Sequence, residues 1–307
     1  MTNSSSDPLA NAVPVSASTQ FPDVYAFTVD VEEWFQVGAF ENTIKRSDWR
    51  ALESRVEEQT YKVLGLLDHC GVKASFFCLG WVAARYPLLI NAIHNAGHEV
   101  GCHGMDHERL FRFSREEFIA DVFKAKALLE DAIGVEVKGY RAPSFSLTPE
   151  VWWVYEVLEQ AGFSYSSSLY PLKTDHYGMP DAPRRPFWPI GEGRILEAPM
   201  TVCKMLGRSL PGSGGGYFRL LPYALGHHLL SAGAKQNRAP GIFYMHPWEV
   251  DPDQPYRDDA PLLSRFRHYT GQAALPKKLE RLCAAHKWMR LREAIVAPAY
   301  QSLEARG

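Results

Sequence analysis

The chain has 307 residues, of which 46% are hydrophobic and 22% are charged, and its formal net charge is −2 at pH 7. These values are typical of a soluble globular protein. They argue against nucleic acid or an anionic membrane as the main partner, because phosphate binding requires a basic surface. No stretch approaches the roughly 20 consecutive apolar residues that a membrane-spanning helix needs.

The first 20 residues are rich in Ser, Asn, Ala and Pro. They lack the basic cluster followed by an apolar core that marks a secretory signal. We therefore expect a disordered tail over 1–20 and a cytoplasmic location. The five cysteines are scattered without a Cys-x-x-Cys pair, which agrees with a reducing compartment.

From residue 24 onward, short apolar runs alternate with segments of helical periodicity. The strand candidates are Val24–Val31, Ala74–Leu79, His98–Cys102, Lys138–Arg141, Tyr165–Ser167, Arg194–Pro199 and Gly241–Met245. The helix candidates are Arg55–Cys70, Tyr86–Ala96, Glu116–Ile133 and Glu150–Ala161. Such alternation implies right-handed crossovers and a parallel sheet. Seven strands predict an α/β protein, a distorted (β/α)7 barrel related to the TIM barrel.

Local signals mark the ends of two of these helices. Ser114 and Glu117 are spaced as a capping box, and Gly134 is a stop signal for the helix that follows them. Thr148 followed by Pro149 is typical of the first turn of the next helix.

The second half of the chain is less regular. The glycine-rich segment Ser209–Gly216 lacks the Gly-Lys-Ser/Thr ending of a phosphate-binding loop. Residues Lys277–Ile295 are predicted to form a packed terminal helix that is basic on one side. We expect a barrel domain over 21–260, with irregular C-terminal additions that include a helical extension over 261–307 packed on the barrel.

Polar residues follow several of the predicted strands at the point where each strand ends. In a parallel barrel these ends meet at one face, which is where the reacting groups of such enzymes gather. Asp30 and Glu32 alternate along their strand, so both side chains can point to one pocket. His103 and His107 are spaced i,i+4 and would project to the same side of a helical turn. Two imidazoles and a carboxylate can hold one metal ion.

Each residue also has a purely structural interpretation. Asp30 and Glu32 could cap a helix, the two histidines could be a surface feature, and a histidine such as His246 could be satisfied in the core. Arg141, which ends the fourth predicted strand, is more often structural when it is considered alone. Their joint placement at strand ends favours a metal-dependent hydrolase over these separate explanations.

The order of the motifs resembles the NodB-homology polysaccharide deacetylases, carbohydrate esterase family four, and is most similar to the exopolysaccharide-locus (exosortase-associated) deacetylases. The resemblance covers about 24–255. The family's Thr-Phe-Asp-Asp motif corresponds to Thr28–Glu32 here, in which Asp30 matches the general base. Val31 stands where the metal-binding Asp is expected, and Glu32 is the substitute ligand. His103 and His107 match the two metal-binding histidines.

The remaining motifs assign further roles by the same resemblance. Arg141 matches the residue that orients the base, and His246 matches the general acid. The oxyanion donor, a backbone N–H in the family, could belong to Ser144 or to Phe145. Trp248 could line the acetyl pocket or serve in packing.

The resemblance implies hydrolysis of N-acetyl groups on the amino sugars of a polysaccharide or of its biosynthetic intermediate. It implies a divalent metal ion that activates a water molecule, with zinc expected and cobalt or another divalent ion as substitutes. The expected partner is an N-acetylated glycan, with no nucleic acid and no membrane span; a homo-oligomer stays open. The aromatic residues that could stack on sugar rings or belong to the core are Trp34, Phe35, Tyr170, Trp188 and Trp248.

Three other functions stay open at this stage. The chain could be a metal-dependent amidase that acts on a small cyclic amide, as allantoinase-like members of the same superfamily do. It could be an inactive carbohydrate-binding relative, which the displaced carboxylate would favour. It could also be a structural subunit of a polysaccharide synthesis complex.

Overall fold

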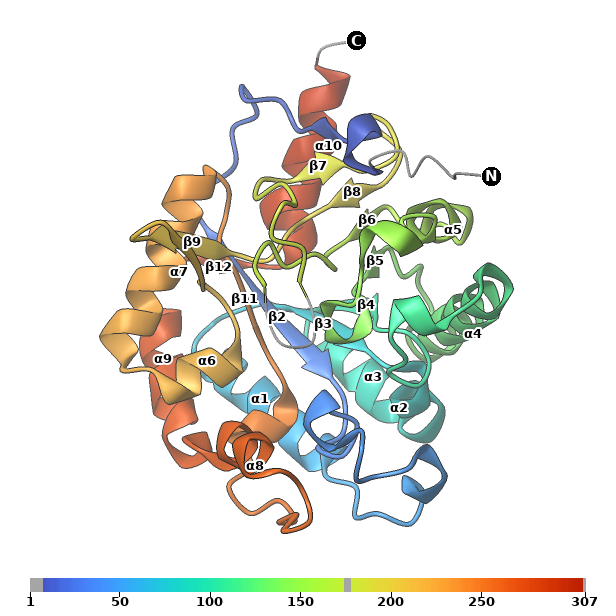
Figure 1. Ribbon diagram of the computed structural model, residues 1–307, viewed down its shortest axis with the longest axis vertical. Coiled ribbons are helices and arrows are strands. Elements are labelled where there is room, and N and C mark those ends of the chain that lie inside the picture. The colour runs from blue at the N-terminus through green and yellow to red at the C-terminus, as the bar shows by residue number, and fades with distance from the viewer. Residues whose placement is uncertain (1–7, 174–177, 306–307) are drawn as a thin grey trace.

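The computed structural model describes residues 8–173 and 178–305 of the chain, and within these residues a ten-stranded sheet forms the centre of the fold (Figure 1). The strand order is β1-β7-β8-β6-β5-β4-β3-β2-β11, and β12 pairs with β2 beside this path. A separate hairpin consists of β9 (Val202–Met205) and β10 (Arg208–Pro211).

Seven strands along the main path of the large sheet run parallel to one another. They are β2 (Tyr25–Val31), β3 (Ser75–Cys78), β4 (Glu99–Cys102), β5 (Gly139–Tyr140), β6 (Tyr165–Ser166), β8 (Leu196–Glu197) and β11 (Ile242–Met245). They coincide with the seven predicted strands, so the predicted α/β class is confirmed. Among the described strands no pairing joins β11 to β8, and the barrel is therefore open between them.

Helices cover the outside of this sheet (Figure 1). Those in the barrel are α1 (Val56–His69), α2 (Gly80–Arg85), α3 (Pro87–Asn95), α4 (Arg115–Ile133), α5 (Val154–Gln160), α6 (Gly215–Leu220) and α7 (Tyr223–Asn237). Those further along the chain are α8 (Leu262–Tyr269), α9 (Leu275–Ala285) and α10 (Ala297–Glu304). None of the helices in the described ranges is long and apolar enough to cross a membrane.

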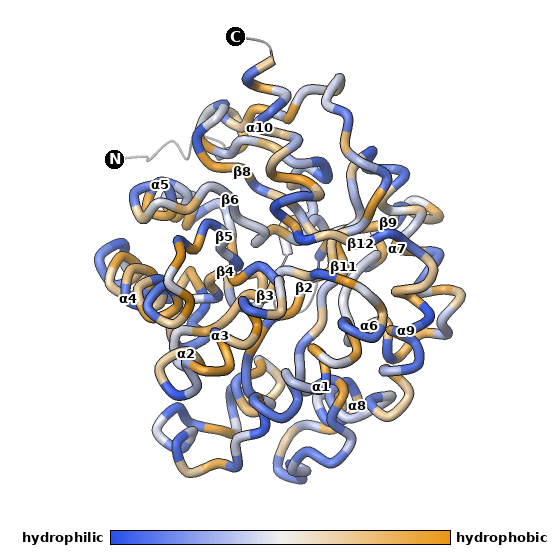
Figure 2. The backbone as a smooth tube through the Cα atoms, turned by 180° about the vertical axis from the view of Figure 1, so that it is seen from behind, coloured by the Kyte–Doolittle hydropathy of each residue, from blue (hydrophilic) through white to orange (hydrophobic). Residues whose placement is uncertain are grey.

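In helix α4, residues predicted from the sequence to cap the helix determine where it begins and ends. The Ser114 side chain accepts a hydrogen bond from the Glu117 N–H, and the Glu117 carboxylate accepts one from the Ser114 N–H, as the capping box predicts. Gly134 ends the helix at a φ of 71°, a conformation that glycine adopts without strain. Hydrophilic and hydrophobic residues alternate along α4 in Figure 2, and its buried residues, among them Phe118 and Val122, join the main core.

The tail differs from the single helix predicted over Lys277–Ile295. Helix α9 ends at Ala285, and the chain then forms the strand β12 (Trp288–Met289), which pairs in parallel with Tyr25 and Ala26 of β2. A π-helix over Arg292–Val296 follows and leads into α10. After the helix ends, residues 287–289 supply hydrogen-bond partners to the start of β2, where the Tyr25 N–H donates to the Lys287 carbonyl at 2.8 Å.

The N-terminal region also departs from expectation. Residues 1–7 of the tail that we expected to be disordered lie outside the described residues. Within the rest of it, β1 (Val13–Pro14) pairs antiparallel with β7 (Phe187–Trp188), and Val15 is 3% exposed in an apolar cluster. Burial of that apolar side chain and the added strand pairing order this segment, which composition alone does not reveal.

Candidate active site

The carboxyl ends of the parallel strands meet around a cavity of about 190 Å³. Most of the site residues predicted from the sequence line it: Asp30, Glu32, His103, His107, Ser144, Phe145, His246 and Trp248. Asp30 lies in β2 and Glu32 follows it, while His103, Arg141 and His246 directly follow β4, β5 and β11. Residues that are distant in sequence are brought together because parallel strands end at the same edge.

Glu32, His103 and His107 each offer a ligand atom, and these three atoms lie within 4.8 Å of one another. The Glu32 Oε2 atom lies 2.8 Å from the His107 Nε2 atom. Burial alone would raise the pKa of the Glu32 carboxyl, but the imidazoles of His107 and His246 hold it well below its usual range. The group is therefore an anion. Two imidazoles and one carboxylate, with room for further ligands in the cavity, fit a divalent ion such as zinc.

His103 is held in the form that a metal ligand requires. Its Nδ1 atom lies 2.8 Å from the carbonyl oxygen of Arg141, which can only accept a hydrogen bond, so Nδ1 carries the proton. Burial lowers the pKa of His103 to about 4, so the ring is neutral at neutral pH. Nε2 then keeps its lone pair free for a cation, which is the usual arrangement for a histidine ligand.

The two histidines do not lie on a helical turn, contrary to the prediction. Residues 103–107 form an irregular loop in which Gly104 has a φ of 77° and His107 a φ of 54°. Helix α2 holds this loop, since the Gly80 N–H donates to the Gly104 carbonyl, and α4 holds it through Asp121, which accepts from the Met105 N–H at 3.0 Å. These contacts turn the chain sharply, so that the two rings converge without helical geometry.

Asp30 is fixed by a buried ion pair with Arg141. The Arg141 Nη1 atom donates to Asp30 Oδ1 at 2.7 Å and to Thr28 Oγ1 at 2.8 Å, and Nη2 donates to Ser167 Oγ at 3.1 Å. Arg141 is fully buried and stacks over the ring of Phe77, with 4.2 Å between the guanidinium carbon and the ring centroid. The hydrogen bond from Arg141 thus fixes the Asp30 carboxylate through Oδ1, while Asp30 also lines the cavity.

Two backbone N–H groups were candidate oxyanion donors, those of Ser144 and Phe145. The Phe145 N–H donates to the carbonyl of Ala142 at 3.1 Å. In the part of the chain that the structure describes, no acceptor is found for the Ser144 N–H. Ser144 and Phe145 both have positive φ angles, 54° and 48°, an uncommon conformation for these residue types. The geometry favours Ser144, because its N–H is still available.

His246 is connected to a buried pair that the sequence analysis missed. Its Nδ1 atom lies 2.9 Å from Glu249 Oε1, and the other oxygen of Glu249 accepts from Arg219 Nε at 2.7 Å. Glu249 is fully buried and Arg219 nearly so. The Glu249 position, three residues after His246, was a signal in the sequence, whereas Arg219 lies 30 residues before Glu249 and had none.

The carboxylates around His246 determine its charge. Burial alone would lower the pKa of His246, but Glu32 and Glu249 outweigh that effect and raise it to about 9. A cation on Glu32 would compete for that carboxylate, which would leave Glu249 as the main partner of the imidazolium. His246 is therefore held in a protonated form that can donate from Nε2, which lies 3.5 Å from Glu32 Oε1.

Trp248 has a polar contact that the sequence analysis did not predict. Its indole Nε1 donates to Glu32 Oε1 at 3.2 Å, and its ring stacks between His246 and His268, with centroids 5.0 and 4.4 Å away. The residue both lines the cavity and orients the carboxylate of the candidate metal site.

The other aromatic residues proposed for sugar stacking lie elsewhere. Trp34, a candidate for stacking on a substrate sugar, lines neither the active-site cavity nor its neighbour. It is 1% exposed in a cluster with Phe35 and Phe40, and its indole N–H donates to the carbonyl of Glu53. Tyr170 and Trp188 are fully buried in another cluster. Apolar packing and a buried hydrogen bond explain these positions, so of the two alternatives the core role holds for Trp34, Tyr170 and Trp188. Phe35 lines a second cavity.

Comparison with known families supports the resemblance. Residues 48–165 match the sequence model of the polysaccharide deacetylase family, and residues 167–296 match that of a domain of unknown function (DUF3473). The first segment contains His103, His107 and Arg141, and the second contains His246 and Glu249. Asp30 and Glu32 precede both. These matches support the polysaccharide deacetylase family, NodB homology or carbohydrate esterase family four, and leave its exopolysaccharide-locus subclass undecided.

Curated relatives match shorter segments. A peptidoglycan-N-acetylglucosamine deacetylase from Bacillus cereus is 34% identical over 86 residues, which are 28% of this chain and 31% of that protein. A peptidoglycan deacetylase from Helicobacter pylori is 29% identical over 113 residues, which are 35% of this chain and 36% of that protein. The chain thus matches about a third of the length of these two relatives.

Solved structures agree with the fold over almost the whole chain. A candidate polysaccharide deacetylase from Mycobacterium smegmatis has a TM-score of 0.58 at 22% identity, with 96% of this chain and 94% of that chain covered. A peptidoglycan N-acetylglucosamine deacetylase in complex with an N-hydroxybenzamide has a TM-score of 0.50 at 16% identity, with 93% and 91% covered. These likenesses show a NodB-like deacetylase fold.

Proposed function

We propose, from the likeness of this chain to polysaccharide deacetylases, that it is a metal-dependent hydrolase that removes N-acetyl groups from the amino sugars of a glycan. The observation that supports it most is the convergence of Glu32, His103 and His107 in one cavity with Asp30 and His246. Zinc is the proposed ion, and an exopolysaccharide or its cytoplasmic intermediate is the proposed substrate. The motif resemblance favours that substrate.

The residues present have the chemistry that such a reaction needs. A divalent ion held by Glu32, His103 and His107 would supply Lewis acidity toward a water molecule and the acetamide oxygen. Asp30 accepts the proton of the attacking water, since the hydrogen bond from Arg141 Nη1 aims its carboxylate. The Ser144 N–H donates to the oxygen that becomes negatively charged during the attack.

His246 completes the reaction by protonating the departing amine. An amine is a poor leaving group as an anion, so a proton donor must reach the nitrogen before the C–N bond breaks. The Nδ1 contact with Glu249 fixes the ring and leaves Nε2 to face the cavity. Glu249 is in turn held by Arg219, so the proton donor is positioned through two buried charges.

The direct test measures acetate release and metal content on one preparation. Purified protein loaded with zinc or cobalt is incubated with N-acetylglucosamine oligomers, and acetate is quantified while elemental analysis counts ions per chain. We expect acetate release that requires one bound ion and that an N-hydroxybenzamide inhibits. Hydrolysis of allantoin with no release of acetate would identify a cyclic amidase, and glycan binding without turnover would identify an inactive binding protein.

Substituting Glu249 by Gln tests the proton donor. Gln keeps the hydrogen bond to Nδ1 but removes the negative charge that raises the pKa of His246. The acid form is required for turnover, so activity should fall on the alkaline side at a lower pH than in the wild type. A pH–rate profile of kcat measures this, with Glu57→Gln on the exposed face of α1 as the control. An unshifted alkaline limb would show that Glu249 does not tune His246.

A further inference from the structure

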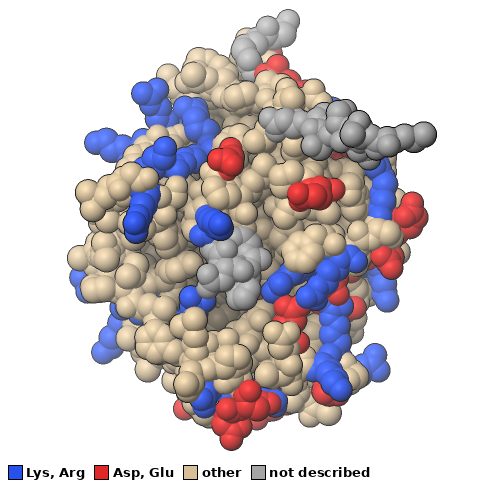
Figure 3. Space-filling model, viewed as in Figure 1, with Lys and Arg blue, Asp and Glu red and all other residues tan. Residues whose placement is uncertain are grey.

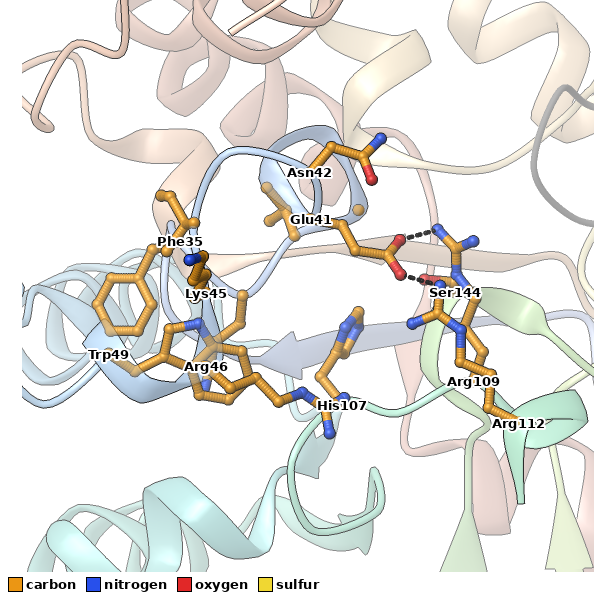
Figure 4. Close-up of a pocket in the computed structure, with 14 residues that line it drawn as sticks. Phe35, Glu41, Asn42, Lys45, Arg46, Trp49, His107, Arg109, Arg112 and Ser144 are labelled. Carbon is orange, nitrogen blue, oxygen red and sulfur yellow. Dashed lines mark ion pairs between the residues drawn. The ribbon is translucent and has the colours of Figure 1, made fainter. Parts of the chain in front are cut away.

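A second cavity, of about 430 Å³, adjoins the active-site cavity (Figure 4). The two share lining residues: Val37, Gly38, His107, Arg109 and Ser144. His107 therefore separates the candidate metal site from a larger space on its other side. A glycan whose acetylated sugar lies at the metal would place the next group of the molecule in this second cavity.

The lining of the second cavity is strongly cationic. Four basic residues line it, namely Lys45, Arg46, Arg109 and Arg112, against one carboxylate, Glu41. Figure 3 shows Lys and Arg side chains at several places on the face that Figure 1 turns to the viewer, with Asp and Glu among them. The whole chain has a net charge of −2, so this local excess of positive charge is not a property of the composition.

Two carboxylates neutralise only part of this charge. Glu41 pairs with both Arg109, at 2.8 Å, and Arg112, as the dashed lines in Figure 4 show. Glu108, outside the lining, pairs with Arg46 at 2.9 Å and with Arg112 at 3.1 Å. Lys45 has no side-chain partner among the residues that the structure describes. Among these six side chains the cations outnumber the carboxylates, so the lining keeps a local positive excess.

The geometry suits a planar or tetrahedral anion. Each guanidinium has five N–H donors in a fixed plane, so Arg109 and Arg112 keep donors beyond those that Glu41 occupies. Arg109 is mostly buried, with 14% of its side chain exposed, and its charge is correspondingly less screened than that of a surface arginine. Phe35 and Trp49 provide apolar walls, and Arg46 lies over Trp49 at 5.6 Å.

We infer that this cavity, the cationic subsite, binds an anionic group that adjoins the acetylated sugar in the substrate. The inference rests on the proposed deacetylase function and narrows its substrate class to acidic glycans or sugar phosphates. A uronate-type or lactyl carboxylate and a phosphate ester share the chemistry required, because both accept charged hydrogen bonds from arginine. The subsite then selects substrate, while the metal site performs the hydrolysis.

Three substrates distinguish the sources of the anion. N,N′-Diacetylchitobiose is neutral, N-acetylglucosaminyl-N-acetylmuramic acid carries a carboxylate, and UDP-N-acetylglucosamine carries a diphosphate. We compare kcat/KM for each in the zinc-loaded wild type, in Lys45→Glu and in Arg112→Gln. Arg115→Gln is the matched control, because Arg115 is similarly exposed but does not line the cavity.

In the wild type we expect at least one anionic substrate to be preferred over the neutral one by about tenfold or more, mainly through KM, which corresponds to one charged hydrogen bond. Lys45→Glu and Arg112→Gln should lower this preference about tenfold, and Arg115→Gln should preserve it. The preference should also decrease as salt increases. Equal kcat/KM for all three substrates, or a preference that both variants retain, would overturn the subsite.

Binding separates failure of the subsite from failure of the proposed function. If none of the substrates releases acetate, the hydrolase proposal fails, and calorimetric titration of the same three compounds still tests the subsite. The subsite would be supported if an anionic compound binds more tightly than the neutral one and if this difference is smaller in Lys45→Glu. Equal affinity for charged and neutral compounds, or no measurable binding of any of them, would reject it.

Discussion

Replacement of Asp30 by Asn is expected to lower kcat for acetate release by a factor of about 10² to 10⁴, the usual contribution of a general base. Asparagine has nearly the same shape and can still accept the hydrogen bond from Arg141 Nη1, but it cannot take a proton from water. Metal content should stay at the wild-type value, since Asp30 is not one of the three converging ligands.

The substitution also has an expected effect on folding. Arg141 is fully buried. In the variant it would keep its hydrogen bonds to Thr28 and Ser167, but it would lose its only ion-pair partner among the described residues. Leaving one buried charge unpaired typically costs about 3 to 5 kcal/mol, so thermal unfolding should move to lower temperature. Asp131→Asn, on the exposed side of α4, serves as the control. A variant that keeps near-wild-type turnover would exclude Asp30 as the base.

Removal of a candidate ligand should abolish tight metal binding. We expect His103→Ala and Glu32→Gln each to weaken zinc affinity by more than about a hundredfold, because substitution of residues that merely orient ligands already costs 10- to 100-fold. The measurement is competition with a coloured chelator, which does not depend on catalysis. Acetate release should be lost in parallel at metal concentrations that saturate the wild type.

A matched control is available for this experiment. His69 is an exposed histidine at the end of α1, and His69→Ala should leave both zinc affinity and turnover unchanged. The His103 variant should stay folded, because the ring lies at the edge of the cavity rather than in the main apolar cluster. Wild-type zinc affinity in either ligand variant would contradict the metal centre described above.

The displaced carboxylate of the first motif has a simple structural explanation. Side chains alternate along a strand, and in this chain residue 31 points away from the side that Asp30 faces. Val31 is fully buried in the main core, whereas Asp30 and Glu32 both line the cavity. Glu32, two residues after Asp30, therefore faces the same side as Asp30 and reaches the two imidazoles. That the two carboxylates face the same side can be derived from the sequence alone.

The seven parallel strands were predictable because each is a short apolar run between helical patterns. The elements that were missed have weaker local signals. β7 and β12 are each two residues long, and they are strands because another backbone segment pairs with them. α2, the helix that follows β3, is only six residues long. Local sequence cannot encode a partner that lies far along the chain, as β12 with β2 demonstrates.

The same contrast holds for the candidate site. The sequence placed Asp30, Glu32, His103, His107 and His246 at strand ends, because periodicity and strand boundaries are local properties. It could not place Trp34, whose indole N–H is satisfied by Glu53 in a buried cluster, since an exposed and a packed aromatic residue look alike in sequence. Nor could it supply the loop conformation of residues 103–107, which α2 and α4 impose through hydrogen bonds.

By itself, then, the sequence determined the order of the seven barrel strands, the main helices of the first half of the chain, and which side chains would stand at the carboxyl edge of the sheet, because residue pattern controls backbone periodicity. It did not reveal the helices α6 and α7 between β10 and β11. Only the tertiary structure decided what surrounds those side chains. The Arg219–Glu249–His246 series and the cationic subsite with Lys45 and Arg112 arise from contacts between segments far apart in the chain. The charge and position of a reacting group depend on such neighbours, since electrostatic interactions act through space and not along the sequence.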